Sequence, residues 1–559
     1  MTLAGLLERA ALRHPDAEAV VDGDARLTYA ALHTRARSLG QTFAGLGVGR
    51  GDRVLIVLKN RLEHVLACWA LQTIAGVPVP VNFRLTAGEI AYVLADSGAR
   101  LVLFEPATAT AVLEATRDHD ATLIFVAPSD AMPTNRPDIL LFDALQEPQR
   151  GTGGGGEGGG EGPMTCFPLP ITREAHRWTD ATKDTAPGAR GQRPLPTTLP
   201  APAAADLSLI LYTSGTTGRP KGVPRTHRNH HAGAVAHALQ CGYVWGERTL
   251  GVMPLYHTMG IHALTSMAAI SGCFVCQPDW SAAGALRLIA GEHVSALYLI
   301  PTLFYDLVHA PEAARTDLSS VRKLAYAGAP MLASLTEACV KAFAPQVFVN
   351  HYGSTEIYTF SVRPDVHRKP GCAGRPGLHS ALRVVTASTE RRVGPDEGVA
   401  RGEKGEIIAR LDSEEAFAGY WNRPDADARA LRDGWYFTGD MGWIDADGEL
   451  YVAGRVDDMI ISGGENIHPV EVEEALARHP AVRDVAVVGE RDERWGERVV
   501  AFVVPATADL TAEALDRFCR ESSDLASFKR PRRIVFVTEI PKTASGKILR
   551  RLLRDGGTA

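Results

Sequence analysis

The sequence predicts an α/β protein: a large N-terminal domain of doubly wound sheets that includes a small β unit, then a smaller C-terminal α/β domain. Three observations lead to this prediction. The chain has 559 residues, which is too long for a single hydrophobic core. Short apolar runs alternate with helical periodicity in two long segments, which is typical of βαβ units and a largely parallel sheet. Beyond residue 371 the pattern changes to short strands and turns.

The expected elements follow in chain order. An amphipathic helix opens the chain, because Leu3, Leu6, Leu7 and Ala10 share one face. Strands of the large domain, residues 1–456, are expected at 54–58, 101–104, 207–212, 296–300, 323–326 and 347–349. The small antiparallel unit is expected at 382–385, 405–409 and 434–452. In the C-terminal domain, residues 457–559, we expect helices at 469–478 and 511–520 and strands at 485–489, 499–504 and 534–537.

Residues 147–205 interrupt the large domain. Residues 151–162 are nearly all glycine, and a stretch rich in proline, threonine and alanine follows them. Such a composition cannot bury enough apolar surface to offset the entropy of ordering the chain. We therefore expect a disordered insertion between two strands of one domain.

Charge and hydropathy narrow the possible partners. The chain has 59 basic and 65 acidic side chains, so neither nucleic acid nor a membrane is expected as a partner. Residues 1–14 lack the basic segment and apolar core of a signal peptide. Residues 249–278 carry no charged side chain, but Pro254 and three glycines argue against a spanning helix. These features predict a cytoplasmic enzyme, and they leave its oligomeric state open.

The most informative motif is TSGTTGRPKG at residues 213–222, directly after a strand-like run. Glycines let backbone N–H groups approach an anion, hydroxyls add donors, and Lys221 adds positive charge. It is not a Walker A motif, because Lys221 follows Pro220 and precedes Gly222. The motif predicts a loop that wraps phosphates.

A second polar segment, NHYGSTE at residues 350–356, follows the strand expected at 347–349. The carboxyl end of a sheet strand is a common place for a nucleotide. There Tyr352 could stack on a base, Thr355 could bond a phosphate and Glu356 could hold Mg²⁺. The segment alone is equally compatible with an ordinary loop.

Three later segments add to this pattern. Asp440 ends the run at residues 436–440 and could accept both ribose hydroxyls, as acidic residues do in dinucleotide sites. Arg455, in the glycine- and aspartate-containing segment 454–458, could meet phosphate or ribose. The polar loop at 541–547 holds two lysines that a moving domain could deliver.

Together these motifs resemble the adenylate-forming family of acyl-CoA synthetases, adenylation domains and luciferases. The resemblance covers the chain except residues 147–205. Residues 454–469 (GRVDDMIISGGENIHP), 494–496 (RWG) and 528–531 (FKRP) resemble the 4-chlorobenzoate and benzoate-type CoA ligases. The resemblance implies a two-step reaction. A carboxylate attacks the α-phosphate of ATP·Mg²⁺, giving an acyl-adenylate and pyrophosphate, and a thiol then displaces AMP.

The resemblance also implies roles for individual residues in the first step. The phosphate loop would be formed by Thr213, Ser214, Gly215, Thr216, Thr217, Gly218 and Lys221. Ala327, Gly328, Ala329 and Tyr352 would border the adenine, while Thr355 would contact phosphate and Glu356 would bind the metal. Asp440 would take the ribose hydroxyls with Arg455 beside them, and Lys547 would bridge carboxylate and α-phosphate.

For the second step, the resemblance implies a mobile C-terminal domain that rotates about a hinge at Asp457. The rotation would remove Lys547 and bring the loop at Gly464 to the thiol tunnel. Positions that hold the CoA nucleotide in the benzoate-type ligases correspond to Arg84, Trp495, Phe528 and Arg530. Aromatic and guanidinium groups suit a phosphorylated adenosine, so these positions favour CoA over a carrier protein.

The acid would lie in a pocket formed by Ala236, His257, Thr258, Met259, Tyr298, His351, Gly353, Tyr358 and Thr359. His257 matches a gate between pocket and tunnel. The chain departs from the chlorobenzoate pattern, with Ala236 where a Phe is expected, His351 for an Ile and Tyr358 for a Met. The pocket is therefore expected to be more polar, which favours hydroxy-, amino- or heteroaromatic acids over halobenzoates. We hypothesise that His351 or Tyr358 reads a ring substituent.

The expected activity is thus an ATP-dependent CoA ligase for a small aromatic acid, with ATP, Mg²⁺ and CoA as cofactors and co-substrates. A CoA ligase for short or medium fatty acids and a stand-alone adenylation enzyme that loads a carrier protein remain alternatives. A luciferase-like oxygenase shares the expected fold, but no feature of the sequence requires it. A nucleotide-binding protein without activity is disfavoured, because Lys221, Glu356, Asp440, Arg455 and Lys547 are all present.

Overall fold

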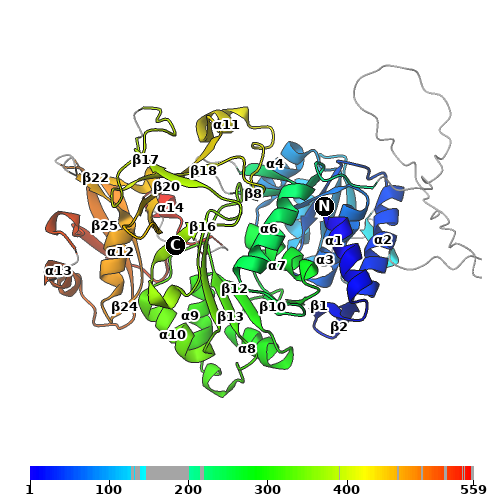
Figure 1. Ribbon diagram of the computed structural model, residues 1–559, viewed down its shortest axis with the longest axis horizontal. Helices are drawn as coiled ribbons and strands as arrows, with labels where there is room; N and C mark the ends of the chain where they lie inside the picture. The colour runs from blue at the N-terminus through cyan, green and yellow to red at the C-terminus, as the bar shows by residue number, and fades with distance from the viewer. Residues whose placement is uncertain are drawn as a thin grey trace, which may run out of the picture. The chain divides into compact units, whose positions relative to one another are not determined.

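The computed structural model describes residues 1–127, 131, 139–145, 201–213, 220–388, 391–462, 465–492, 495–521, 525–543, 546 and 548–554, without the side chains of residues 457, 461, 465 and 466. The described chain forms two compact units, Met1–His231 and Ala232–Ala559 (Figure 1). Both mix helices with sheets, which confirms the predicted α/β class. The expected insertion lies outside the described residues except for residues 201–205. The domain boundary expected after residue 456 stays a prediction.

The first unit is built on a parallel sheet with the strand order β4-β3-β5-β6-β7. Its strands are β3 (Arg53–Val57), β4 (Val77–Pro80), β5 (Leu101–Phe104), β6 (Thr122–Phe125) and β7 (Leu140–Leu141). The helices are α1 (Leu3–Arg13), α2 (Tyr29–Gly45), α3 (Leu62–Thr73), α4 (Ala87–Ser97) and α5 (Ala109–Ala115). Two antiparallel hairpins complete the unit, β1 (Glu18–Asp22) with β2 (Ala25–Thr28) and β8 (Leu207–Thr213) with β9 (Lys221–Thr226).

Helix α6 (His227–Gln240) leads into the second unit, whose sheet begins with five parallel strands in the order β11-β10-β12-β13-β14. These are β10 (Arg248–Gly251), β11 (Cys273–Cys276), β12 (Ala296–Leu299), β13 (Lys323–Tyr326) and β14 (Val347–Tyr352). The connecting helices are α7 (Thr258–Ala269), α8 (Ala282–Gly291), α9 (Pro301–His309) and α10 (Ala333–Phe343), of which α9 contacts both α8 and α10. Since the strands are parallel, their carboxyl ends form one edge of the sheet.

The sheet continues beyond β14 with antiparallel strands in the order β15-β16-β21-β20-β18-β17. Their bounds are β15 (Ser361–Arg363), β16 (Cys372–Pro376), β17 (Leu382–Val385), β18 (Gly405–Arg410), β20 (Trp435–Ile444) and β21 (Leu450–Arg455). Helix α11 (Pro424–Ala430) and the short strand β19 (Leu431–Arg432) lie between β18 and β20 in the chain. This is the small antiparallel unit that the sequence predicts.

The last part of the chain has its own sheet, in the order β23-β22-β25-β24 with β26 parallel to β25. It contains β22 (Ile460–Ser462), β23 (Glu465–Ile467), α12 (Pro469–Ala477), β24 (Val482–Asp492), β25 (Gly496–Pro505), α13 (Ala512–Glu521), β26 (Arg533–Phe536) and α14 (Arg550–Arg554). The predicted helices and strands of this region are thus present within a few residues of their expected bounds. The charge-free residues 249–278 form strands and the 12-residue α7, and none of the described helices is long and apolar enough to cross a membrane.

Candidate active site

The carboxyl edge of the parallel strands brings the predicted adenine and acid residues together. Leu299 of β12 is in register with Tyr326 of β13, which in turn faces Asn350 of β14. The residues that follow these strands therefore share one edge of the sheet. Among them, Gly328 has a φ of +85°, a left-handed conformation that favours glycine at this turn. The end of β14 carries two of the predicted site residues in succession, His351 and Tyr352, and successive strand residues point to opposite faces.

On one face, Tyr352, Asp440 and Arg455 form a linked group. The Tyr352 hydroxyl donates to Oδ2 of Asp440 at 2.6 Å, and the Arg455 guanidinium donates to Oδ1 of Asp440 at 2.7 Å. Asp440 and Arg455 are paired across the β20–β21 hairpin, which fixes their register. Burial, and then the neighbouring Asp440, raises the pKa of Tyr352 well above its usual value. The structure thus joins three residues that the sequence assigns to one nucleotide site.

Glycine is favoured beside this group. Gly439 has a φ of +70°, and a Cβ there would lie 2.7 Å from a terminal nitrogen of Arg455. The guanidinium packs against this bare backbone while it also donates to the carbonyl of Thr438 at 2.9 Å. The sequence Gly439-Asp440 therefore serves two purposes: it aims the carboxylate and leaves room for its cationic partner.

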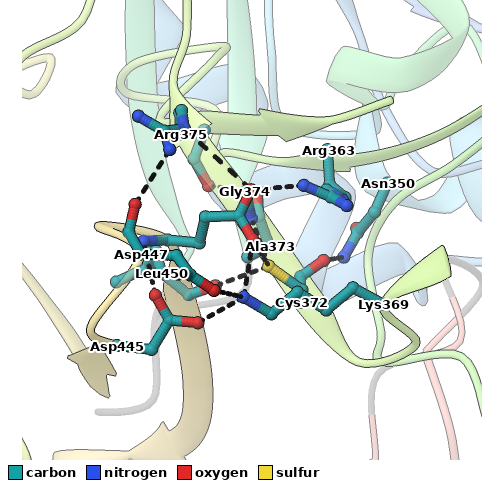
Figure 2. Close-up of polar contacts among 12 residues, drawn as sticks. Asn350, Arg363, Lys369, Cys372, Ala373, Gly374, Arg375, Asp445, Asp447 and Leu450 are labelled. Carbon is teal, nitrogen blue, oxygen red and sulfur yellow. Dashed lines mark hydrogen bonds and ion pairs between the residues drawn. The ribbon is translucent and has the colours of Figure 1, made fainter. Parts of the chain in front are cut away.

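The far end of the same hairpin is held by an ion-pair network (Figure 2). Nζ of Lys369 bonds Asp445 at 2.5 Å, Asp447 at 2.9 Å and Glu449 at 2.8 Å. The three carboxylates hold the pKa of Lys369 above its usual value. Arg375 of β16 donates to the carbonyl of Asp447 at 2.8 Å. The network fastens the turn between β20 and β21 to β16, so that both ends of the hairpin carrying Asp440 are fixed.

Thr355 and Glu356, the predicted phosphate and metal ligands, follow β14 in a tight turn. The hydroxyl of Ser354 accepts from the backbone N–H groups of Glu356 and Ile357, each at 3.2 Å. Thr355 and Glu356 are both buried. The hydroxyl of Tyr420 donates to Oε1 of Glu356 at 2.7 Å, a contact that the sequence did not predict.

On the other face of β14, four buried side chains form what we call the His–Tyr cluster: His237, Tyr298, His351 and Tyr358. The Tyr358 hydroxyl lies 3.0 Å from Nδ1 of His237 and 3.2 Å from the Tyr298 hydroxyl. The Tyr298 hydroxyl lies 3.5 Å from Nδ1 of His351, whose Nε2 lies 3.1 Å from the hydroxyl of Thr359. Three residues predicted for the acid pocket are thus in mutual contact, and Thr359 joins them.

Burial keeps the imidazoles of this cluster neutral. It lowers the pKa of His351 to about 4 and that of His237 well below its usual value. The ring of His262 stacks on that of Tyr358, with centroids 3.6 Å apart. At neutral pH the cluster is therefore polar but uncharged.

His237 and His262 were missed by the sequence analysis. A signal existed for both: His237 is the last of several histidines in 227–237, and His262 follows Thr258 by four residues on the same helix face. Neither spacing shows which residue the imidazole contacts. The contacts of His237 and His262 with Tyr358 could therefore be found only in the structure.

Three further residues predicted for the acid pocket are on helices: Ala236 on α6, and Thr258 and Met259 on α7. All three are buried. The predicted gate, His257, caps α7 by accepting the backbone N–H of Met259 at Nδ1, at 3.2 Å. Burial lowers the pKa of His257 to about 4, which agrees with an accepting, neutral ring. At Gly353 a Cβ would lie 1.7 Å from the carbonyl oxygen of Tyr358, so only glycine fits this turn.

The predicted CoA residues are found on exposed or paired positions. Trp495 and Phe528 are 45% and 42% exposed, unusual for large aromatic side chains. Arg530 forms an ion pair with Asp516 of α13. Arg84 belongs to the first unit, where its guanidinium lies 5.3 Å from the ring centroid of Phe83.

Several predicted residues lie outside the described part of the chain: Ser214, Gly215, Thr216, Thr217, Gly218, Gly464, Lys547 and the side chain of Asp457. Residues next to them in the chain are described. Thr213 pairs with Lys221 at the end of the β8–β9 hairpin. Gly546 packs against Ile300, just after β12, since a Cβ there would lie 2.9 Å from Cδ1 of Ile300. Asp458 forms ion pairs with Arg550 and Arg554 of α14.

Two protein-family models together match most of the chain. The family model for the AMP-binding enzyme matches residues 7–421, and that for the AMP-binding enzyme C-terminal domain matches residues 471–547. The chain belongs to the AMP-binding enzyme family. This membership confirms the predicted family and the predicted enzyme class, an AMP-forming acid–thiol ligase.

Three similar proteins show the range of the family. A 4-chlorobenzoate–CoA ligase of Arthrobacter sp is 32% identical over 555 residues, covering 98% of this chain and 94% of the relative. A long-chain-fatty-acid–CoA ligase of Mycobacterium tuberculosis is 31% identical over 557 residues, covering 98% and 97%. The crystal structure of an anthranilate CoA ligase in complex with anthranoyl-AMP is 26% identical, with a TM-score of 0.82, and covers 100% of this chain and 97% of that one.

Proposed function

We propose that this protein activates a small aromatic carboxylic acid with ATP and transfers the acyl group to CoA. The observation that carries the proposal is the His–Tyr cluster, a polar, uncharged and aromatic group around His351, on the face of β14 opposite to Tyr352. Aromatic rings and neutral hydrogen-bonding groups suit a substituted aryl acid better than a fatty acyl chain, which can neither stack on the rings nor hydrogen-bond to the polar groups.

In the first half-reaction, a carboxylate oxygen attacks the α-phosphorus of ATP, the bond to the bridging oxygen breaks, and pyrophosphate leaves. Asp440, already linked to Tyr352 and Arg455, would accept the two ribose hydroxyls. Thr213, Lys221 and the loop between them would hold the β- and γ-phosphates, and Lys547 would bridge the carboxylate and the α-phosphate. These groups align reactants and stabilise developing charge.

Glu356 would hold the Mg²⁺ that neutralises phosphate charge in this class of reaction, and Thr355 would contact a phosphate. A carboxylate oxygen is the kind of hard ligand that Mg²⁺ prefers, and both residues are buried at the sheet edge where phosphates are expected. The Tyr420 hydroxyl, bonded to Oε1, orients the carboxylate. The site therefore fits the ion by its donor chemistry.

In the second half-reaction, the thiol sulfur attacks the acyl carbon and AMP leaves. We propose that the chain after Asp457 rotates to deliver the CoA-binding side chains Trp495, Phe528 and Arg530, with Arg84 contributing from the first unit. The exposed aromatic rings of Trp495 and Phe528 support this, because such rings would be covered when a purine stacks on them. Neutral His257 would act as a gate rather than as a base.

The fatty-acid ligase remains the second candidate, because a relative of that activity is as similar as the aryl-CoA ligase. A panel of benzoate, hydroxy- and aminobenzoates, furoate, halobenzoates and fatty acids, assayed for pyrophosphate and AMP release with and without CoA, separates the candidates. We expect sustained turnover that requires both CoA and an aromatic acid. Preference for fatty acids, or a single burst of pyrophosphate unaffected by CoA, would contradict the proposal.

A further inference from the structure

The strand that carries Asp440 is interrupted by a β-bulge. The register of β18 and β20 shifts after Glu406, so that Ile407 alone faces residues 438–440. We call residues 438–440 the Asp440 bulge. A bulge bends a strand out of its regular ladder and turns the side chains that it carries, and bulges are common beside active sites.

Two side chains hold the backbone of the Asp440 bulge. Oε1 of Glu406 accepts the backbone N–H of Gly439 at 3.1 Å. The Thr438 hydroxyl accepts the backbone N–H of Asp440 at 3.0 Å and donates its own proton to the carbonyl of Ile407 at 2.7 Å. Side chains thus bond two successive backbone N–H groups of the bulge, a task that a regular ladder leaves to the facing strand.

The bulge is also joined to the cationic partner of Asp440. One terminal nitrogen of Arg455, Nη1, donates to the carbonyl of Thr438 at 2.9 Å and to Oδ1 of Asp440 at 2.7 Å. The place of the Asp440 carboxylate therefore depends on the backbone of residues 438–440. A shift of that backbone would move the carboxylate and the guanidinium together.

Glu406 is a carboxylate at a buried position, where carboxylates are rare unless they have partners. Burial raises its pKa above the usual value, while the Gly439 N–H and the guanidinium groups of Arg432 and Arg455 act in the opposite direction. The side chain thus interacts with the backbone of the bulge and with a charged residue of the predicted ribose site. The sequence analysis did not single out Glu406, because its partner is a backbone N–H on another strand.

We propose that Glu406 is a positioning residue of the ribose site: it holds the Gly439 N–H, maintains the Asp440 bulge and so aims the Asp440 carboxylate at the ribose hydroxyls. Glu406 acts through Asp440 and does not itself have to touch the nucleotide. The inference rests on the proposed function and adds a residue to its nucleotide site.

The test compares the binding of ATP with that of 2′-deoxy-ATP, each with Mg²⁺, by isothermal titration calorimetry. A site that hydrogen-bonds both ribose hydroxyls rejects an analogue that lacks one of them. We expect the wild-type protein to bind ATP roughly 10- to 100-fold more tightly, the factor for one hydrogen bond to a charged group. Glu406→Met removes the acceptor of the Gly439 N–H, so this ratio should fall by about fivefold or more. Glu406→Gln should keep the ratio, because an amide oxygen can still accept that N–H.

Two further variants complete the test. Thr438→Val removes the other side-chain bond to the bulge and should also lower the ratio, which decides the matter if Glu406→Met does not fold. Glu105→Met is the matched control, because Glu105 of the first unit is likewise buried and accepts a backbone N–H, that of Lys59 at 2.8 Å. It should lower Tm and keep the ratio, as a merely structural role of Glu406 would.

Three results would overturn the inference alone: the native ratio in folded Glu406→Met, an equal fall in Glu105→Met, or a wild-type ratio near one. If the wild-type protein binds neither nucleotide, the proposed function fails and the inference fails with it.

Discussion

The variant Gly439→Ala tests whether the Tyr352–Asp440–Arg455 group forms the ribose site. A Cβ at residue 439 would lie 2.7 Å from one terminal nitrogen of Arg455 and 3.2 Å from its central guanidinium carbon. The guanidinium can move away, since it ends a flexible side chain, but it then loses its 2.7 Å contact with Asp440. The substitution therefore acts on the ion pair rather than on the hydrophobic core.

The magnitude has two parts. A left-handed backbone conformation costs a residue with a side chain roughly 1–2 kcal/mol. Loss of a hydrogen bond between charged groups costs about 1.5–3 kcal/mol, and the lower end applies because the two side chains are 24% and 18% exposed. If half or more of the free energy of the Arg455–Asp440 hydrogen bond contributes to nucleotide binding, its loss should raise KM for ATP between a fewfold and about tenfold.

Gly448→Ala is the matched control. Gly448 lies in the turn of the same hairpin, has a φ of +78°, and a Cβ there would meet no atom within 4 Å. Both variants should be less stable to thermal unfolding, because each places a side chain on a left-handed backbone conformation. Only Gly439→Ala should also raise KM for ATP in a pyrophosphate-release assay. Equal KM values for the two variants would refute the reasoning that Arg455 and Asp440 act as a pair in nucleotide binding.

Three further predictions concern stability. Gly353→Ala should prevent stable folding or lower Tm markedly, since a Cβ would lie 1.7 Å from the Tyr358 carbonyl oxygen; a Tm near that of the wild type would contradict this. Because burial lowers the pKa of His351 to about 4, His351 takes up a proton at a higher pH in the unfolded chain than in the folded one. Tm should therefore fall from pH 6.5 toward pH 4, and less steeply in His351→Gln. Parallel pH profiles of Tm in the two proteins would contradict this. Lys369→Met should lower Tm more than the control Lys341→Met, because Lys341 is an exposed lysine on α10. Added salt should reduce the difference in Tm between the two variants. Equal Tm values would show that the network of Figure 2 is dispensable.

The fold and the contacts within the candidate nucleotide site were largely predictable because their signals are local. Strands such as residues 101–104 and 323–326 are short apolar runs with turns on both sides, and the structure has them at those bounds. The pairing of Asp440 with Arg455 follows from a hairpin whose strands the sequence already marks. The position of Tyr352 at the end of a parallel strand follows from the same patterning.

The arrangement of the residues proposed for the acid pocket was predictable in outline only. Tyr298, His351 and Tyr358 could be named from motif positions, but the sequence shows neither that they contact one another nor that His237 joins them. His237 is on α6, more than a hundred residues from Tyr358 in the chain, so the contact depends on how the helix packs on the sheet. Gln240, on the same helix, contacts Thr359 and the backbone N–H of Leu378, and no residue pattern reveals these contacts.

The most direct test of the central claim follows the oxygen atoms of the acid. The protein is incubated with ATP, CoA and a hydroxy- or aminobenzoate labelled with heavy oxygen in its carboxylate, and the products are analysed by mass spectrometry. An acyl-adenylate route predicts that acyl-CoA forms and that one labelled oxygen is found in AMP, because the attacking carboxylate oxygen stays on the α-phosphate. Unlabelled AMP, or label in pyrophosphate or inorganic phosphate, would contradict the account.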